Sequence, residues 1–173
     1  ELVWENTFDA PTDLTGWTLH DIDGNGNTWV QGKNWYLELQ ADGKYKTIEG
    51  TAGVLRYSIA NLDGTYVPGY DKENNWIISP MIDLTGASGQ IQLVVNWNIN
   101  DPRGNGVNMD VYISESSDLA TFQALYENPS DYYFYDGDTS LPSDFNQFGE
   151  SIIDISAFAG KKIYMGFPRT VIV

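Results

Sequence analysis

Apolar and polar residues alternate in short stretches along most of this 173-residue chain. Because successive side chains of a β-strand point to opposite faces of a sheet, each alternating stretch predicts a strand with one buried face. The longest stretch, residues 91–99, is mostly apolar with polar Gln92, Asn96 and Asn98, and it predicts a long central strand. The other predicted strands cover residues 2–8, 35–39, 54–59, 109–114, 151–155 and 162–167.

Turn-forming residues separate these predicted strands. Asp-Gly pairs stand at 23–24, 42–43, 63–64 and 136–137, and further glycines at 32, 50, 86, 89 and 104. Glycine adopts positive φ without strain and aspartate bonds to nearby backbone, so both are typical of tight turns. The sequence Asp-Leu-Thr-Gly at 13–16 and again at 83–86 is interpreted as two similar turns. Many short strands joined by turns predict an all-β protein, either an antiparallel β-sandwich or a jelly roll.

Helical spacing is confined to one stretch, residues 117–126. Its apolar residues Leu119, Phe122, Leu125 and Tyr126 fall three or four positions apart, behind a Ser-Asp start. We therefore expect one short helix on a connection between strands. No shift in composition marks a linker, so the chain is predicted to form a single domain over residues 1–173.

The chain is strongly acidic, with 24 Asp and Glu residues against 9 Lys and Arg, and its formal net charge is −15. Nucleic acids and anionic membranes attract clustered basic residues, and here the only basic doublet is Lys161-Lys162. Neither is therefore an expected partner. No apolar run approaches the roughly 20 residues of a membrane-spanning helix, so we expect no membrane insertion, and a monomer by default.

Cysteine is absent and histidine occurs once, as His20. Disulfides, thiolate metal sites and a cysteine nucleophile are therefore excluded. No Gly-x-Ser-x-Gly sequence occurs, and His20 is interpreted as an ordinary strand or loop residue. A glycosidase needs two carboxylates roughly 5–10 Å apart, and no such pair stands out among the acidic residues. We expect no enzymatic activity, with a glycoside hydrolase as the alternative among enzymes.

Residues 21–27, Asp-Ile-Asp-Gly-Asn-Gly-Asn, place side-chain oxygens at Asp21, Asp23 and Asn25 and a glycine at position 26. This alternation matches the opening of a calcium-binding loop. The loop is not an EF-hand, because its twelfth position holds Gly32 in place of a glutamate. Two interpretations remain: a structural Ca²⁺ bound with help from carbonyls or a distant carboxylate, or a turn rich in Asp and Asn.

Four stretches, in order along the chain, carry a family resemblance. The first runs from Phe8-Asp9 through Gly16-Trp17-Thr18-Leu19 and the acidic loop to Trp29, and the others are residues 75–84, 110–114 and 153–167. Together they resemble the cleaved-adhesin, or choice-of-anchor J, domains repeated in the haemagglutinin-adhesin regions of gingipain proteases. The resemblance covers nearly the whole chain.

This resemblance implies a jelly-roll β-sandwich related to galactose-binding-like and MAM-type domains, on a secreted or surface-anchored bacterial protein. It also implies a stabilising Ca²⁺. Asp9 matches the family's acidic residue after the first strand, which commonly serves an ion, and Asp21, Asp23 and Asn25 match its acidic loop. The family usually continues to a final strand with an Asp-Asp pair, whereas this chain stops at Val173. An ion site at Asp9 would lack those ligands.

The first residues, Glu-Leu-Val-Trp, lack the basic start and long apolar stretch of a signal peptide. For a secreted or cell-surface protein, we expect that the leader has been removed.

Four consecutive aromatic residues, Tyr132, Tyr133, Phe134 and Tyr135, cannot all face one core, because neighbours in an extended chain point to opposite sides. In one interpretation Tyr132, Tyr133 and Tyr135 form a ligand-binding surface, since aromatic faces contact sugar rings. In the other, they pack a long loop against itself. The sequence as a whole predicts a noncatalytic, calcium-stabilised, adhesin-like module that binds a host surface protein or glycan. The alternative is a carbohydrate-binding module of a polysaccharide-processing system.

Overall fold

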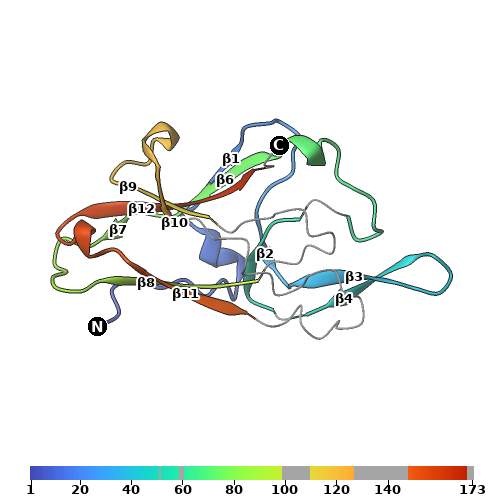
Figure 1. Ribbon diagram of the computed structural model, residues 1–173, viewed down its shortest axis with the longest axis horizontal. Helices are drawn as coiled ribbons and strands as arrows, with labels where there is room; N and C mark the ends of the chain where they lie inside the picture. Colours follow the sequence, from blue (N-terminus) through green and yellow to red (C-terminus); the bar gives the residue numbers. More distant parts are fainter. Residues whose placement is uncertain (51, 59–60, 99–109, 127–147, 171–173) are drawn as a thin grey trace.

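A six-stranded antiparallel sheet, assembled from distant parts of the chain, forms the larger layer of the fold (Figure 1). The computed structural model describes residues 1–50, 52–58, 61–98, 110–126 and 148–170. Five strands follow the order β1 (Thr18–Asp21), β6 (Asn74–Ile78), β12 (Lys162–Thr170), β9 (Val111–Ser114) and β10 (Gln123–Tyr126), and β7 (Ile82–Asp83) pairs with the start of β12. The long strand β12 pairs with three others and organises the sheet.

Two further strands, β8 (Gln92–Trp97) and β11 (Gly149–Asp154), pair antiparallel and form the second layer. Along β11, Ser151 and Ile153 are buried while Ile152 and Asp154 are exposed, as expected for a strand with one face on a core. The core is shared between the layers and consists of Ile82, Leu84, Val111, Ile113, Ile153, Ile155, Ile163 and Met165. Burying side chains of this size contributes about 1.5–3 kcal/mol each. The predicted all-β, antiparallel β-sandwich is confirmed.

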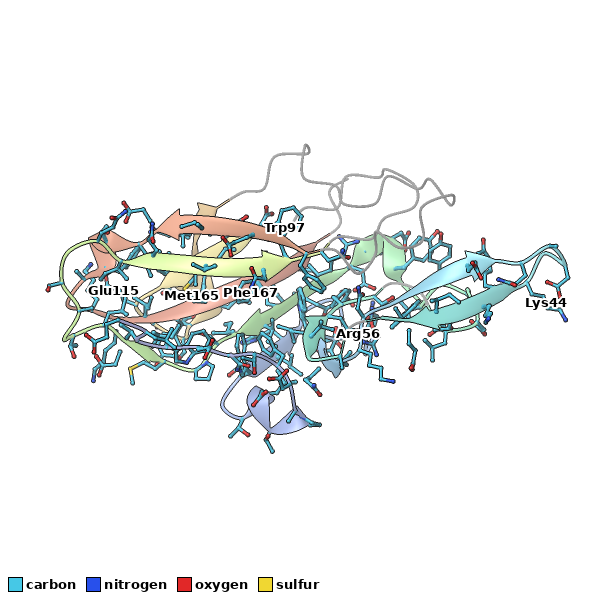
Figure 2. The ribbon with its side chains drawn as sticks, turned by 90° about the horizontal axis from the view of Figure 1, so that it is seen from below. Lys44, Arg56, Trp97, Glu115, Met165 and Phe167 are labelled. Carbon is cyan, nitrogen blue, oxygen red and sulfur yellow. The ribbon has the colours of Figure 1, made fainter. Side chains whose placement is uncertain are left out.

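Two small ribbons complete the described strands. β2 (Val30–Gly32) pairs with β5 (Val54–Arg56), and β3 (Trp35–Leu39) pairs with β4 (Tyr45–Glu49). The β3–β4 hairpin projects away from the two sheets, and Figure 2 shows Lys44 at its tip. Its turn is closed by the Gln40 amide, which donates to the Lys44 carbonyl at 2.8 Å, while Gly43 adopts φ +78°.

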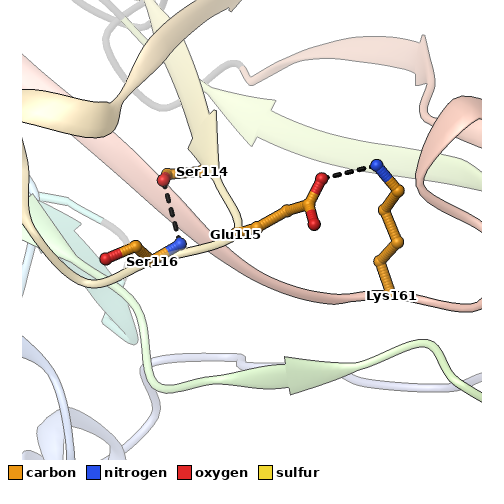
Figure 3. Close-up of polar contacts among 4 residues, drawn as sticks. All are labelled: Ser114, Glu115, Ser116 and Lys161. Atoms are coloured by element: carbon orange, nitrogen blue, oxygen red, sulfur yellow. Dashed lines mark hydrogen bonds and ion pairs between the residues drawn. The ribbon is translucent and has the colours of Figure 1, made fainter.

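An exposed ion pair links the end of β9 to the start of β12. Lys161 Nζ lies 2.5 Å from Glu115 Oε1, and the Ser116 amide donates to Ser114 Oγ at 3.0 Å (Figure 3). Exposed pairs of this kind contribute only about 0–1 kcal/mol, so the sandwich depends on its apolar core more than on this contact.

Most strand predictions are confirmed, and two predictions of local structure are wrong. Residues 2–8 form no strand; Trp4 and Phe8 instead pack their rings against Trp17, with centroids 6.2 and 5.4 Å apart. The predicted helix at 117–126 is a single 3-10 turn, η3 (Leu119–Thr121), followed by β10. Pairing of β10 with β9 overrides the local helical spacing, because tertiary hydrogen bonds outweigh weak intrinsic propensity.

The other described helical elements are also 3-10 turns: η1 (Pro11–Leu14), η2 (Tyr70–Lys72) and η5 (Ser156–Phe158). None of the helices in the described part of the chain is long and apolar enough to cross a membrane.

Candidate functional site

The acidic loop of residues 21–27 follows β1 directly and is shaped by its own carboxylates. Asp21 accepts hydrogen bonds from the backbone amides of Gly24 and Gly26, each at 2.8 Å and each through a different oxygen. Both glycines have positive φ, which a side chain would resist. The Asp21 carboxylate therefore stabilises a tight turn over residues 21–26.

Asp23 joins this loop to the large sheet. Its Oδ1 accepts the Asn25 amide at 2.9 Å, and its Oδ2 accepts the Asn74 amide at 2.6 Å and Asn75 Nδ2 at 2.9 Å. Asn25 Oδ1 in turn accepts the Asn27 amide at 2.7 Å. Because Asn74 begins β6, the loop is held at one end of that strand.

A buried carboxylate that the sequence did not single out lies beneath the loop. Glu73 is only 2% exposed, and four neutral groups donate to it. Asn25 Nδ2 and Asn27 Nδ2 each donate to Oε1 at 3.2 Å, while Asn75 Nδ2, at 2.8 Å, and the Tyr57 hydroxyl donate to Oε2. Burying a polar group without hydrogen bonds is unfavourable, so these four donors satisfy the Glu73 carboxyl group where water is excluded.

Asn75 occupies the centre of this network. Its Nδ2 lies 2.7 to 2.9 Å from three oxygens, those of Asp23, Glu73 and Tyr57. The residue is 1% exposed, and its Oδ1 is buried without a hydrogen bond within the described residues. An amide has only two N–H bonds for these three acceptors. Asn75 thus serves as a neutral bridge between two carboxylates.

The Tyr57 hydroxyl keeps its proton, and so remains a hydrogen-bond donor, at neutral pH. Burial, followed by the hydrogen bond to Glu73 and the charge of that carboxylate, raises the pKa of the Tyr57 phenol. Trp29, at the end of the acidic loop, packs on the Tyr57 ring with centroids 5.4 Å apart. This contact joins the residues after the acidic loop to the tyrosine of the network.

Asp9 makes no hydrogen bond to the acidic loop among the residues that the structure describes. It follows Phe8, whose φ is +55°, and its carboxylate lies against Gly53, with no described hydrogen bond to Asp21, Asp23 or Asn25. The described residues contain no group of three or more His, Cys, Asp or Glu side chains placed to hold a metal ion. The loop fits a hard cation in donor type, since all its candidate ligands are oxygens. In the present arrangement those oxygens accept N–H groups, and calcium binding stays a prediction.

The aromatic run at Tyr132, Tyr133 and Tyr135 lies outside the described residues, so its role also stays a prediction. A different aromatic pair lies near the acidic loop: Tyr66 and Tyr70 stack with centroids 4.2 Å apart and an interplanar angle of 20°. Tyr70, at the start of η2, is 38% exposed. Gly69, which precedes Tyr70, packs beside Asn25: a Cβ added to Gly69 would lie 3.5 Å from the Asn25 Cβ.

His20 lies within β1, opposite Trp76 of β6, which agrees with its interpretation as a strand residue. Glu73 was missed because its role depends on contacts between distant residues, and the tyrosine pair was missed although its members are only four positions apart. The bond from Asn25 to Glu73 spans 48 positions, and an isolated glutamate before a strand carries no recognisable pattern.

Comparison with solved structures places this fold among cleaved adhesin domains. The K3 cleaved adhesin domain of Lys-gingipain from Porphyromonas gingivalis w83 superposes with a TM-score of 0.53 and 17% identity, over 89% of this chain and 82% of that one. The K2 domain of Lys-gingipain gives a TM-score of 0.51 and 20% identity, over 90% and 81%. No protein-family model matches the chain, and no curated protein matches it significantly. The predicted resemblance is confirmed at the level of fold, and both neighbours are adhesin domains.

Proposed function

We propose that this chain is a noncatalytic, adhesin-like binding module of a secreted or cell-surface bacterial protein, which binds a host surface protein or a glycan. The observation that carries the proposal is its fold, shared over about nine-tenths of its length with two adhesin domains. The polar groups of the described loop network support it as well, because Asp21, Asp23 and Glu73 are engaged in structural hydrogen bonds. A module of this kind binds through exposed loops supported by a rigid sandwich.

The proposed ligand surface is the aromatic run, with Tyr132, Tyr133 and Tyr135 as contacts. A mammalian glycan array and a panel of immobilised extracellular matrix proteins should give saturable binding to at least one component. The double variant Tyr133→Ala plus Tyr135→Ala should lose that binding, because aromatic faces supply the contact area. Tyr164→Phe, in β12, is the matched control and should bind as the unmodified chain does.

Binding confined to glycans would favour the alternative, a carbohydrate-binding module. The stacked and partly exposed Tyr66–Tyr70 pair favours that alternative, since flat aromatic pairs offer a platform for sugar rings. Turnover of any polysaccharide by the purified chain would overturn the noncatalytic assignment and indicate a glycoside hydrolase instead.

We further propose that Ca²⁺ stabilises the module, held by Asp21, Asp23 and Asn25, with Asp9 as a further candidate ligand. The support is the alternating set of oxygens in a loop that also contacts β6 through Asp23. A bound calcium ion would neutralise part of the negative charge that Asp21 and Asp23 bring to this loop.

Calcium removal tests this directly by differential scanning calorimetry. If free Ca²⁺ is about 100 times the dissociation constant, binding stabilises the fold by about 2.7 kcal/mol, so EGTA should lower Tm by roughly 5–10 °C. The double variant Asp21→Ala plus Asp23→Ala should no longer respond to EGTA. Asp42→Ala, in the similar Asp-Gly turn of the β3–β4 hairpin, should respond as fully as the unmodified chain. An unchanged Tm on chelation would remove the calcium proposal.

A further inference from the structure

Arg56 is a half-buried cation without a carboxylate partner among the residues that the structure describes. It stands at the end of β5, near the base of the β3–β4 hairpin (Figure 2). Four of the described lysines, Lys33, Lys44, Lys161 and Lys162, lie within 4.0 Å of an acidic side chain, and the described Lys46 and Lys72 are exposed. In a chain with 24 acidic residues, an unpaired guanidinium in a partly buried position requires an explanation.

The strand geometry directs Arg56 toward an aromatic ring. In β5, Arg56 is two residues after buried Val54, so both side chains leave the same face of the strand. Its Cζ lies 5.8 Å from the centroid of the Trp35 ring, in cation–π geometry. Gly32 of β2 lies beside this side chain, where an added Cβ would be 3.8 Å from Arg56 Nε.

The hydrogen-bonding capacity of Arg56 is largely unused. Its Nε is buried without an acceptor within the described residues, whereas the two terminal Nη atoms are not cut off from solvent. Glu49 is the residue opposite Trp35 in the β3–β4 ribbon, and its carboxylate is already paired with Lys33 at 2.6 Å. Burial alone lowers the pKa of Arg56, with no carboxylate acting against it. Arginine nevertheless stays charged in proteins, so the Arg56 guanidinium keeps N–H donors without a carboxylate acceptor among the described residues.

We propose that Arg56 and Trp35 form a binding site for a single carboxylate carried by a ligand. The two Nη atoms match the two oxygens of a planar carboxylate, which lysine cannot contact in this paired way. Trp35 holds the guanidinium in place and offers an apolar surface beside it. A polyanion is disfavoured, because the net charge of −15 repels it at longer range. The carboxylate comes from an acidic sugar or from the C-terminus of a peptide, and this site does not depend on the proposed adhesin function.

Nuclear magnetic resonance of the Arg56 Nε–H and Trp35 indole groups tests the site. The probes are methyl glucuronide for an acidic sugar and N-acetylalanine for a peptide terminus, each beside its neutral analogue, methyl glucoside or N-acetylalanine amide. At least one acid should shift both resonances saturably, with a dissociation constant on the order of millimolar. Its neutral analogue should not, and the acid that binds identifies the source. About 0.5 M NaCl should weaken the binding, because salt screens exposed charge.

Variants then assign the effect to the guanidinium. Arg56→Gln should abolish the shift of the indole resonance, and Arg56→Lys should weaken binding by roughly tenfold, because the charge stays but the paired donors are lost. Lys44→Gln, at the exposed hairpin tip, is the matched control and should bind as the unmodified chain does. Equal shifts from an acid and its neutral analogue, or equal loss in Lys44→Gln, would overturn the proposal. If Arg56→Gln does not fold, the comparison of acid and amide on the unmodified chain decides alone.

Discussion

Asn75 is the residue on which the polar interior of this protein depends most. Its neutral side-chain amide donates to both Asp23 and Glu73 and so bridges two acidic side chains. Asn25 and Asn27 add donors from the loop, and Tyr57 adds one from the chain after β5. The loop that resembles a calcium site is therefore tied to β6 by amide groups, whether or not a cation adds to them.

Replacing Asn75 with alanine should destabilise the fold by about 3 kcal/mol, because a buried carboxylate loses a donor. The expected fall in Tm is roughly 6–12 °C, measured by calorimetry. Glu73→Gln in the Asn75→Ala background should restore part of the loss, since a neutral amide replaces the carboxyl group that lost a donor. Asn96→Ala, an exposed residue of β8, should change stability by less than about 0.5 kcal/mol. A double variant as unstable as the sum of its single changes would contradict a cost that arises from the lost hydrogen bond to Glu73.

At the scale of elements, several strands end in the same turn chemistry. Asp83 ends β7 and accepts hydrogen bonds from the backbone amide and the hydroxyl of Thr85, at 2.9 and 2.6 Å. Asp154 ends β11 and accepts the corresponding two bonds from Ser156, at 2.8 and 2.5 Å. These bonds lower the pKa of each aspartate. Two of the 24 acidic residues, Asp83 and Asp154, thus serve to terminate strands.

Titration of Asp83, followed by carbon NMR of its carboxyl group, should give a pKa below 3.8, the value for an unperturbed aspartate. The Thr85 hydroxyl is the largest cause, so Thr85→Ala should raise the pKa toward that value. Because the folded-state pKa is the lower one, the stabilisation is present above the unfolded-state pKa and is lost as pH falls through the folded-state pKa. A pKa unchanged in Thr85→Ala would show that the hydroxyl bond is unimportant.

The strands were largely predictable from alternation, and the elements that were mispredicted show why alternation is not sufficient. Leu119 and Phe122 have helical spacing, yet the following residues pair with β9, which local spacing cannot reveal. Trp4 and Phe8 alternate, yet they pack around Trp17 outside any sheet. The same holds for the candidate site. The loop of residues 21–27 was recognisable from its sequence pattern, whereas Glu73 lies beside that loop only in the folded chain.

At the scale of the molecule, the sandwich provides a frame of two layers, and the candidate binding features lie outside its shared apolar core. The acidic loop, the Tyr66–Tyr70 pair and the Arg56–Trp35 pair all lie on connections or on the small ribbons rather than in the shared core. Similarity to two adhesin domains, at 17% and 20% identity, identifies the fold. The ligand depends on these surface features, because a fold does not by itself determine a function.

Binding of the fluorescently labelled chain to cultured human epithelial cells, measured by flow cytometry, tests the proposed adhesin function most directly. The account predicts saturable binding that excess unlabelled chain displaces. Treatment of the cells with protease or with glycosidases then shows whether a host protein or a glycan is recognised. Binding that does not saturate, or that a heat-denatured chain reproduces, would contradict the proposal that this chain is an adhesin-like module.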